Sequence, residues 1–424
     1  MKPSFAETPT GNRRKFLKQL SAGSLAALAY PALAGAGPLP AFTHSLDEAY
    51  WEVVKKQFTV PGNLIMLNAA NLCPSPQFIS ERVISFTKDL NKDVSFQYRS
   101  VFSERRAKAI AMLAPFIGVE REELGITRNT SESNGIVVNG LDFKAGDEII
   151  TWEQNHPSNG IAWEKLAKRY GLIVKKILLP SSPVNIEELV TPFSRAITSK
   201  TRLIAFSHIS NLSGMALPAK EICSLAKAKG ILTLVDGAQS LGMMELNLKS
   251  MGCDFYTAST HKWLMGPMEN GILYVRKELL ELLWPNIIGG GWKEEGRTVD
   301  EKICVLGQRN DPTTAALPDI IEFHLTIGKK NIEDRAMKLI AYLKEQIRIK
   351  IPQATFLTPL SAGMSGAIVV FNLPGKDPKE IHQKLYEVYG IATAATGGVR
   401  LSPHIYNTID DLNKVVEALT RLVG

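Results

Sequence analysis

Apolar and polar positions change their spacing along the chain, and from about residue 63 short apolar runs alternate with amphipathic stretches. Short apolar runs predict buried strands, whereas apolar residues three and four positions apart predict helices. The strand candidates are residues 147–152, 172–179, 202–208, 231–235, 254–259 and 271–276. Helical patterns at 158–170 and 218–229 lie between several of them. This alternation predicts an α/β protein with a largely parallel sheet covered by helices.

The pattern changes after about residue 310. The later candidates are a long helical stretch at 315–350, a strand at 367–373, a helix at 377–389, a short strand near 399–402 and a final helix at 409–423. This order predicts a smaller α+β domain. We therefore expect four parts: a leader (residues 1–36), an arm with little periodicity (37–62), a large domain (63–310) and a small C-terminal domain (311–424).

The leader has the features of an export signal. Residues 12–18 read Asn-Arg-Arg-Lys-Phe-Leu-Lys, and an Ala-rich apolar run follows from Leu20 to about Ala34. This order resembles a twin-arginine signal peptide, which implies export to the periplasm by the twin-arginine machinery and cleavage near Ala34 or Ala36. The alternatives are a transmembrane anchor or a basic surface arm, but the run is short for an anchor.

Charge and cysteine content exclude several other classes of protein. The formal net charge is +7, and residues 1–40 carry five basic residues against Glu7 alone, so the basic excess lies mostly in the leader and does not favour nucleic acid. None of the four cysteines forms a C-x-x-C pair, and no P-loop or histidine spacing typical of a metal site occurs. The sequence cannot choose among possible disulfide pairings.

Polar residues follow four of the predicted strands. These sets are Glu153-Gln154-Asn155-His156, Ser207-His208-Ile209-Ser210-Asn211, Asp236-Gly237-Ala238-Gln239 and Ser259-Thr260-His261-Lys262. The carboxyl ends of parallel strands meet at one edge of a sheet, and ligands of open α/β sheets bind there. We therefore expect the four sets to converge on one cleft.

Two of these sets carry a resemblance to a known family. Asp236-Gly237-Ala238-Gln239, about two dozen residues before Ser259-Thr260-His261-Lys262, resembles the class V aminotransferases. The resemblance implies the fold of aspartate aminotransferase, fold type I, with a mostly parallel seven-stranded sheet between helices. It also implies pyridoxal 5′-phosphate (PLP) as cofactor, carried as a Schiff base on Lys262.

The resemblance assigns roles around the cofactor ring. Asp236 would keep the pyridine nitrogen protonated, since the ring withdraws electrons well only in that state. Gln239 and Asn211 would lie near the ring hydroxyl. His156 would stack on the ring, although a capping role for the helix after Pro157 is the alternative.

The phosphate of the cofactor needs N–H groups and hydroxyls at the start of a helix. Thr130 and Ser131 open a helical run and resemble the phosphate loop of the family, and an ordinary capping motif is the alternative. Ser259 and His261 are the other expected contacts. Relatives also use a neighbouring subunit, for which Thr298 is the candidate here, and the resemblance therefore implies a homodimer.

Arg400 resembles the arginine that binds the substrate carboxylate, and Asn71 belongs to the segment that lines the substrate side. Cysteine desulfurases carry a nucleophilic cysteine shortly before this arginine, but residues 390–400 contain none. The stretch looks most like the isopenicillin N epimerase-like branch. We therefore expect transamination or epimerisation of an amino acid or related amine. A desulfurase or lyase, or a binding protein without catalysis, remains the alternative.

Overall fold

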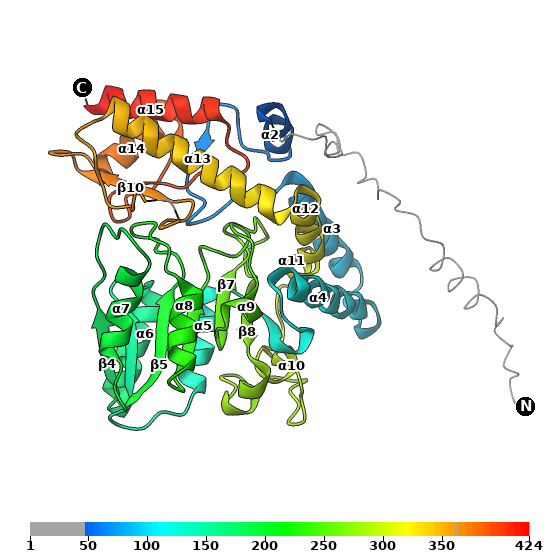
Figure 1. Ribbon diagram of the computed structural model, residues 1–424. Coiled ribbons are helices and arrows are strands. Elements are labelled where there is room, and N and C mark those ends of the chain that lie inside the picture. The colour runs from blue at the N-terminus through cyan, green and yellow to red at the C-terminus, as the bar shows by residue number, and fades with distance from the viewer. Residues whose placement is uncertain (1–46, 362, 424) are drawn as a thin grey trace, which may run out of the picture. The chain divides into compact units, whose positions relative to one another are not determined.

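The computed structural model describes residues 47–361 and 363–423, and the predicted leader lies outside them. Its centre is a seven-stranded sheet in the order β2-β8-β7-β6-β5-β3-β4 (Figure 1). Only β8 runs antiparallel to its neighbours. The strands are β2 (Leu124–Thr127), β3 (Glu148–Trp152), β4 (Ile173–Ile177), β5 (Thr201–Ser207), β6 (Leu232–Asp236), β7 (Phe255–Ser259) and β8 (Gly271–Val275). The mostly parallel sheet expected from the sequence is confirmed.

Helices cover both faces of this sheet. On one face, α5 and α6 form a buried cluster with residues of the central strands, for example Val137 and Trp163 against Leu234. On the other face, Phe193 of α7 meets Phe206 of β5 with 5.9 Å between ring centroids. The bounds are α5 (Thr130–Gly140), α6 (Pro157–Tyr170), α7 (Glu187–Ala196), α8 (Ala219–Lys227) and α9 (Leu248–Met251). Because the sheet is buried on both faces, most strands read as continuous apolar runs.

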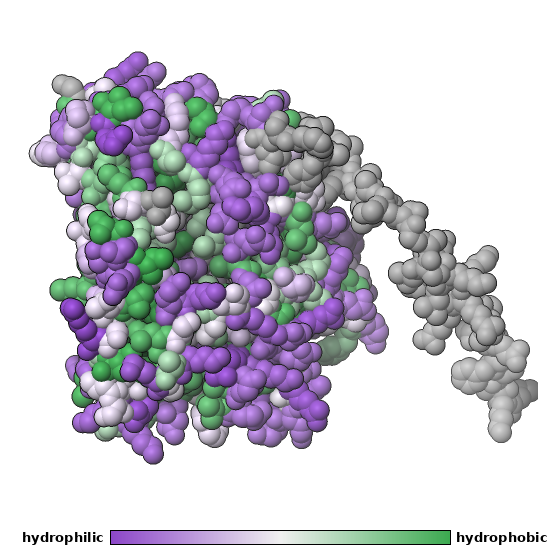
Figure 2. Space-filling view, in the orientation of Figure 1, coloured by the Kyte–Doolittle hydropathy of each residue, from purple (hydrophilic) through white to green (hydrophobic). Residues whose placement is uncertain are grey.

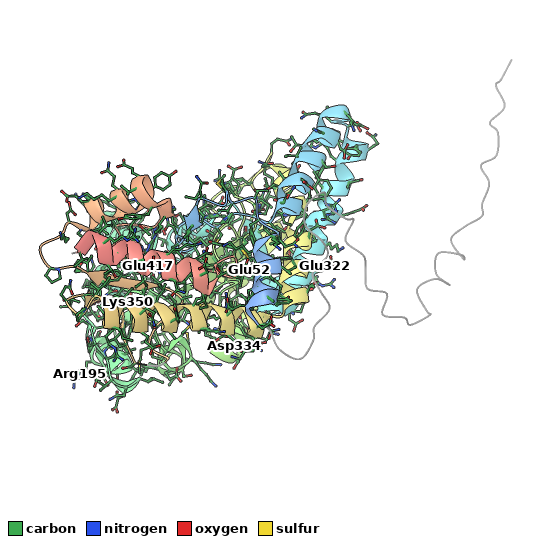
Figure 3. The ribbon with its side chains drawn as sticks, turned by 90° about the horizontal axis from the view of Figure 1, so that it is seen from above. Glu52, Arg195, Glu322, Asp334, Lys350 and Glu417 are labelled. Atoms are coloured by element: carbon green, nitrogen blue, oxygen red, sulfur yellow. The ribbon has the colours of Figure 1, made fainter. Side chains whose placement is uncertain are left out.

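The C-terminal region holds a three-stranded antiparallel sheet, β12-β10-β9, with helices packed against it. Its elements are α12 (Leu317–Ile327), α13 (Lys329–Lys350), β9 (Thr355–Phe356), β10 (Val369–Asn372), α14 (Pro378–Tyr389), β11 (Ile391–Ala392), β12 (Val399–Leu401) and α15 (Ile409–Val423). The sequence predicted one helix over 315–350, but Gly328, with φ of 93°, separates α12 from α13. Figure 3 shows α13 and α15 with the exposed side chains of Lys350 and Glu417.

The segment before the large sheet is more ordered than its weak periodicity suggested. Residues 48–55, expected to belong to an arm, form α2 (Glu48–Lys55), which Asp47 caps by accepting a bond from the Tyr50 N–H. Arg335 of α13 donates to both carboxylate oxygens of Glu48 and stacks on Trp51. The short strand β1 (Ile65–Met66) then pairs in parallel with β11. The helix is therefore held by the C-terminal region.

Two long helices, α3 (Gln77–Lys92) and α4 (Phe96–Ile117), lie beside the sheet and pack against the short helix α11 (Asp311–Ala315). A further short helix, α10 (Val299–Lys302), contacts β2. Hydrophilic residues cover most of the face drawn in Figure 2. No helix of the described chain is long and apolar enough to cross a membrane.

Candidate active site

The four polar sets at the carboxyl ends of β3, β5, β6 and β7 meet at one edge of the sheet, where the His156 N–H donates to the Ser207 hydroxyl and the His208 N–H donates to the Asp236 carbonyl. Lys262 lies three residues beyond β7, and its amine has no hydrogen bond within the described residues. Burial lowers the pKa of Lys262, the carboxylate of Asp236 opposes this shift, and the guanidinium of Arg400 adds to it. These influences place Lys262 between an acid and a second cation, with a larger share of neutral, nucleophilic amine than an exposed lysine has.

Asp236 ends β6 and is only 3% exposed. Its carboxylate accepts hydrogen bonds from the Ala238 N–H at 3.1 Å and from the Asn134 side chain at 3.0 Å. Asn134 is itself fixed, because Thr257 donates to its amide oxygen at 2.6 Å. The carboxylate therefore has a defined orientation and remaining lone pairs toward the cleft. Asn134 was missed in the sequence, although its place four residues after Thr130 puts both on one side of α5.

His156 caps α6, as its alternative assignment proposed, and the ring also faces the site. Its Nδ1 accepts from the Ser158 N–H at 3.3 Å, so a neutral ring carries its proton on Nε2. Burial lowers the pKa of His156, Asp236 opposes that shift, and Lys262 adds to it. A neutral imidazole beside both groups suits a stacking role, and capping explains how the ring is oriented.

Thr130 and Ser131 lie in the first turn of α5, and Asn129 is the capping residue, since it accepts from the Glu132 N–H at 2.9 Å. The N–H of Thr130 donates to the Ser259 hydroxyl at 2.8 Å. His261 follows β7 nearby, and burial lowers its pKa to about 4. Its Nδ1 is buried without a partner in the described chain. Hydroxyls, a helix N-terminus and an unused ring nitrogen together fit a phosphate group.

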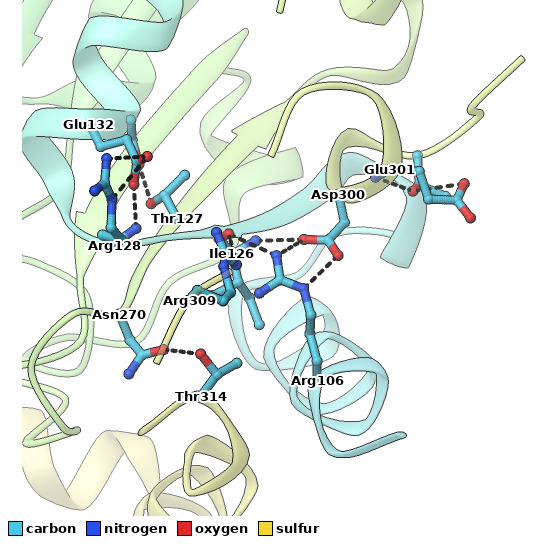
Figure 4. Close-up of polar contacts among 12 residues, drawn as sticks. Arg106, Ile126, Thr127, Arg128, Glu132, Asn270, Asp300, Glu301, Arg309 and Thr314 are labelled. Atoms are coloured by element: carbon cyan, nitrogen blue, oxygen red, sulfur yellow. Dashed lines mark hydrogen bonds and ion pairs between the residues drawn. The ribbon is translucent and has the colours of Figure 1, made fainter. Parts of the chain in front are cut away.

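A cluster of charged side chains fixes the backbone just before the first turn of α5 (Figure 4). Asp300 accepts from the Ile126 N–H at 3.0 Å and from Arg106, and both Arg106 and Arg309 donate to the Ile126 carbonyl. Ile126 lies shortly before Asn129, the capping residue of α5, so these bonds fix where the helix begins. Thr298 caps α10 by accepting from the Glu301 N–H, and within the described chain it has no contact with the phosphate turn.

Arg400 lies on β12 and is 4% exposed. It donates to the Asn211 carbonyl at 3.1 Å and to the Asn68 side-chain oxygen at 2.9 Å, while its Nε is buried without a partner. No carboxylate of the described chain pairs with it, and burial lowers the pKa of Arg400 to about 10. A buried cation with free N–H groups is a fitting site for a carboxylate. Asn71 is exposed near this segment and donates from its backbone N–H to the Asn68 carbonyl.

The side chain of Gln239 forms hydrogen bonds with two separate segments at the site. Its amide nitrogen donates to the Ala70 carbonyl at 2.9 Å, and its oxygen accepts from the Trp263 indole N–H at 2.8 Å. One amide hydrogen remains for a ligand. The Asn211 side chain has no role in the bond to Arg400, which uses its carbonyl. His208, directly after β5, is buried, and its Nδ1 has no hydrogen-bond partner in the described chain.

The residues present fit pyridoxal phosphate. Lys262 has a free amine for the covalent link, Asp236 a fixed carboxylate for the pyridine nitrogen, and Thr130 with Ser259 a cradle for the phosphate. The buried Nε–H of Arg400 is an unpartnered donor that a bound anion would satisfy, and the unpartnered Nδ1 of His261 can donate in one of its neutral tautomers. Together with the sheet order, this defines a PLP-dependent enzyme of fold type I.

Comparisons with known proteins agree with this class. Residues 68–415 match the family model "Aminotransferase class-V", and the chain belongs to this family. The chain is 30% identical to isopenicillin N epimerase from Streptomyces clavuligerus over 89% of its own length and 99% of the relative. It is 28% identical to a probable cysteine desulfurase from Pyrococcus abyssi over 88% of its length and 97% of the relative. The family and its PLP cofactor are therefore shown, as predicted from the sequence.

Solved structures show the same architecture. The apo cysteine desulfurase from Thermococcus onnurineus superimposes with a TM-score of 0.78 at 26% identity, over 87% of this chain and 97% of that one. A complex of the cystine C–S lyase C-DES with its product cysteine persulfide gives a TM-score of 0.77 at 23% identity, over 85% and 98% of the two chains. The second likeness is one of fold, and the predicted fold class is confirmed.

Proposed function

We propose that this protein acts on the α-amino group of an amino acid or a related amine, by transamination or epimerisation. The observation that carries the proposal is the pairing of a buried lysine and a buried arginine, neither of which has an acidic hydrogen-bond partner in the described chain. Lys262 would hold the cofactor, and Arg400 would bind the substrate carboxylate. The match to isopenicillin N epimerase over nearly its whole length supports the same reading.

Each residue has a physical task in this scheme. Bound PLP supplies an electron sink for the negative charge left at the substrate Cα. Asp236, oriented by Asn134, would hold the proton at the pyridine nitrogen, and His156 would cover one face of the ring. Lys262 removes the proton from Cα and can return a proton, because its amine is desolvated and partly neutral. Where the proton returns would decide the product. Return to the cofactor carbon would lead to a keto acid, whereas return to the opposite face of Cα would give the epimer and needs a second acid on that face, because Lys262 serves one face only.

Cysteine desulfuration is the second candidate, because probable cysteine desulfurases are among the relatives. A desulfurase needs a reactive thiolate. All four cysteines of the sequence, Cys73, Cys223, Cys253 and Cys304, are buried, and burial raises the pKa of every one of them. None lies in residues 390–400 before Arg400. These facts favour chemistry at the amino group of the substrate. They leave open one form of sulfur chemistry, a lyase reaction that needs no protein thiol.

The first experiment uses the purified protein loaded with PLP and a panel of L- and D-amino acids. We expect the visible absorption to change with one class of amino acid, and chiral chromatography to detect either a keto acid or the opposite enantiomer. Release of sulfide from cysteine would favour the second candidate. The Lys262→Ala variant should lose PLP retention and turnover, and substantial turnover in that variant would contradict the mechanism. No reaction with any amine would favour a binding protein.

We also propose that the chain is exported by the twin-arginine machinery, on the basis of Arg13, Arg14 and the apolar run after them. Replacing both arginines with lysine should leave the protein in the cytoplasm at full length, detected by fractionation and mass spectrometry. Export of the double variant at the normal level would exclude this route.

A homodimer is the assembly we propose. Phe96 is 85% exposed and Trp284 70% exposed, and apolar Ile287 and Ile288 follow in the same loop as Trp284. Large apolar side chains so exposed are typical of surfaces that bind another chain. Sedimentation velocity should give a dimer, and Phe96→Glu with Trp284→Glu should shift it toward a monomer. A wild-type monomer at micromolar concentration would contradict this.

A further inference from the structure

The guanidinium of Arg400 has two protein partners, and both are neutral oxygens. The Asn211 carbonyl accepts from Nη1 at 3.1 Å, and the Asn68 side-chain oxygen accepts from Nη2 at 2.9 Å. Of its five N–H groups, these bonds occupy two, and the buried Nε–H has none. The group is therefore oriented by the protein while its positive charge stays uncompensated.

The backbone of the chain sets where the Asn68 side chain lies. Asn68 pairs in parallel with Ser402, two residues beyond Arg400. The Ser402 N–H donates to the Leu67 carbonyl at 2.8 Å, and the Ala69 N–H donates to the Ser402 carbonyl at 3.0 Å. These two bonds bracket Asn68. Its amide oxygen therefore meets the guanidinium without a mobile loop between them.

The same segment continues to the cofactor side of the site. The Ala70 carbonyl accepts from Gln239 at 2.9 Å, and the Cys73 N–H donates to the carbonyl of His261 at 3.0 Å. Residues 68–73 thus join the strand that carries Arg400 to the loop that carries Lys262. Both ends of this segment are hydrogen-bonded, so one continuous stretch of backbone connects the surroundings of Arg400 with those of Lys262.

An amide at position 68 differs from a carboxylate in one decisive way. Asparagine and aspartate have nearly the same shape, and either oxygen can accept from Nη2. Aspartate would add a negative charge in contact with a buried guanidinium, and the resulting ion pair would compete with a substrate carboxylate. Asparagine orients the arginine without this competition.

We propose that Asn68 is a positioning and specificity-determining residue, which aims Arg400 while leaving its charge for the carboxylate of the substrate. This inference rests on the proposed function in assigning Arg400 to substrate. The ligands that it selects carry one carboxylate, placed as close to the reacting amino group as it is in an α-amino acid. Substrates without that carboxylate gain nothing from Asn68.

The test compares Asn68→Asp with Asn139→Asp, which introduces the same charge at an exposed position of α5. Propionate is the probe, and its binding is measured by calorimetry on both PLP-loaded and cofactor-free protein. We expect Asn68→Asp to weaken propionate binding by about tenfold or more, and Asn139→Asp to leave it unchanged. With a substrate amino acid, Asn68→Asp should raise KM more than it lowers kcat.

Asn68→Ser keeps a neutral acceptor and covers the case in which Asn68→Asp fails to fold. We expect Asn68→Ser to bind propionate less than about tenfold more weakly than the wild type. Wild-type affinity in a folded, PLP-loaded Asn68→Asp protein would overturn the inference, as would wild-type protein that does not bind propionate. If propionate binds in an Asn68-dependent way but no amine is turned over, the proposed function fails and this inference stands.

Discussion

The hydroxyl oxygens of Thr130 and Ser259 are 2.6 Å apart, although one residue opens α5 and the other ends β7. This contact joins a helix N-terminus to the strand that leads to Lys262. Phosphate binding and the position of the reactive lysine are therefore parts of one local structure.

Ser259→Ala should weaken PLP binding. The change removes a hydroxyl that accepts from the Thr130 N–H and that would bond to the phosphate. Because hydrogen bonds to charged groups contribute about 1.5–3 kcal/mol, we expect the dissociation constant of PLP to rise about tenfold or more. Equilibrium dialysis measures it. Ser85→Ala, exposed on α3, is the control, and equal affinities in the two variants would contradict the assignment.

Asn134→Ala should lower kcat in protein saturated with PLP. Asp236 would lose the donor that orients its Oδ2, and Thr257 would lose its acceptor. We expect a loss in kcat of about tenfold or more, equivalent to about 1.4 kcal/mol, and a lower melting temperature of the cofactor-free protein. Asn139→Ala, on the exposed side of the same helix, serves as control. An unchanged kcat would show that Asp236 needs no such support.

The rate at which cofactor-free protein captures PLP should depend on pH through Lys262. Only the neutral amine reacts, and burial lowers its pKa, so the rate should reach half its maximum below the ordinary lysine value of about 10.4. Arg400→Gln removes a cation that lowers this pKa and should move the midpoint to higher pH. Arg195→Gln, on α7 (Figure 3), should not. A midpoint that falls in Arg400→Gln would contradict the electrostatic account.

Stability should decrease as the solution is acidified below about pH 6.5. Burial lowers the pKa of His404 to about 4, and its Nε2 donates to the Trp263 carbonyl at 2.8 Å. The unfolded chain therefore binds a proton at higher pH than the folded one, and this contribution is lost as pH falls from about 6.5 toward about 4. For His404 alone we expect the free energy of unfolding to fall by about 2 kcal/mol between pH 7 and pH 5. Urea denaturation of His404→Gln, which keeps an N–H donor, should show a smaller loss, and an equal loss would exclude His404 as a cause.

The strands and most helices could be predicted because their signals are local. Within the candidate 271–276, for example, residues 272–275 are all apolar, and the structure places β8 there. The helix α2 could not, since its eight residues gain their stability from Arg335 and Asp411, which lie hundreds of positions later. The break at Gly328 was missed because the apolar spacing of the two flanking helices reads almost continuously.

The residues of the candidate site also differ in whether the sequence could predict them. Lys262, Asp236 and Arg400 follow from residue type and place at a strand end or in a recognised stretch. Asn134 and Asn68 act through other side chains, and only coordinates show which atom each one contacts. The capping role of His156 is seen in the structure, whereas stacking on the cofactor ring stays a prediction with which the capping bond is compatible, since that bond orients the imidazole.

The pairing of β1 with β11 joins Ile65 to Ile391, close to opposite ends of the chain. A ribosome that has made the whole central sheet has not yet supplied β11, the partner of β1, nor Arg400. The candidate site therefore closes only after residues 391–400 have been made. An assembly intermediate that ends before residue 391 would expose the segment before α3 and retain Lys262 in an open pocket, so truncation before residue 391 should abolish function while leaving the central sheet able to form.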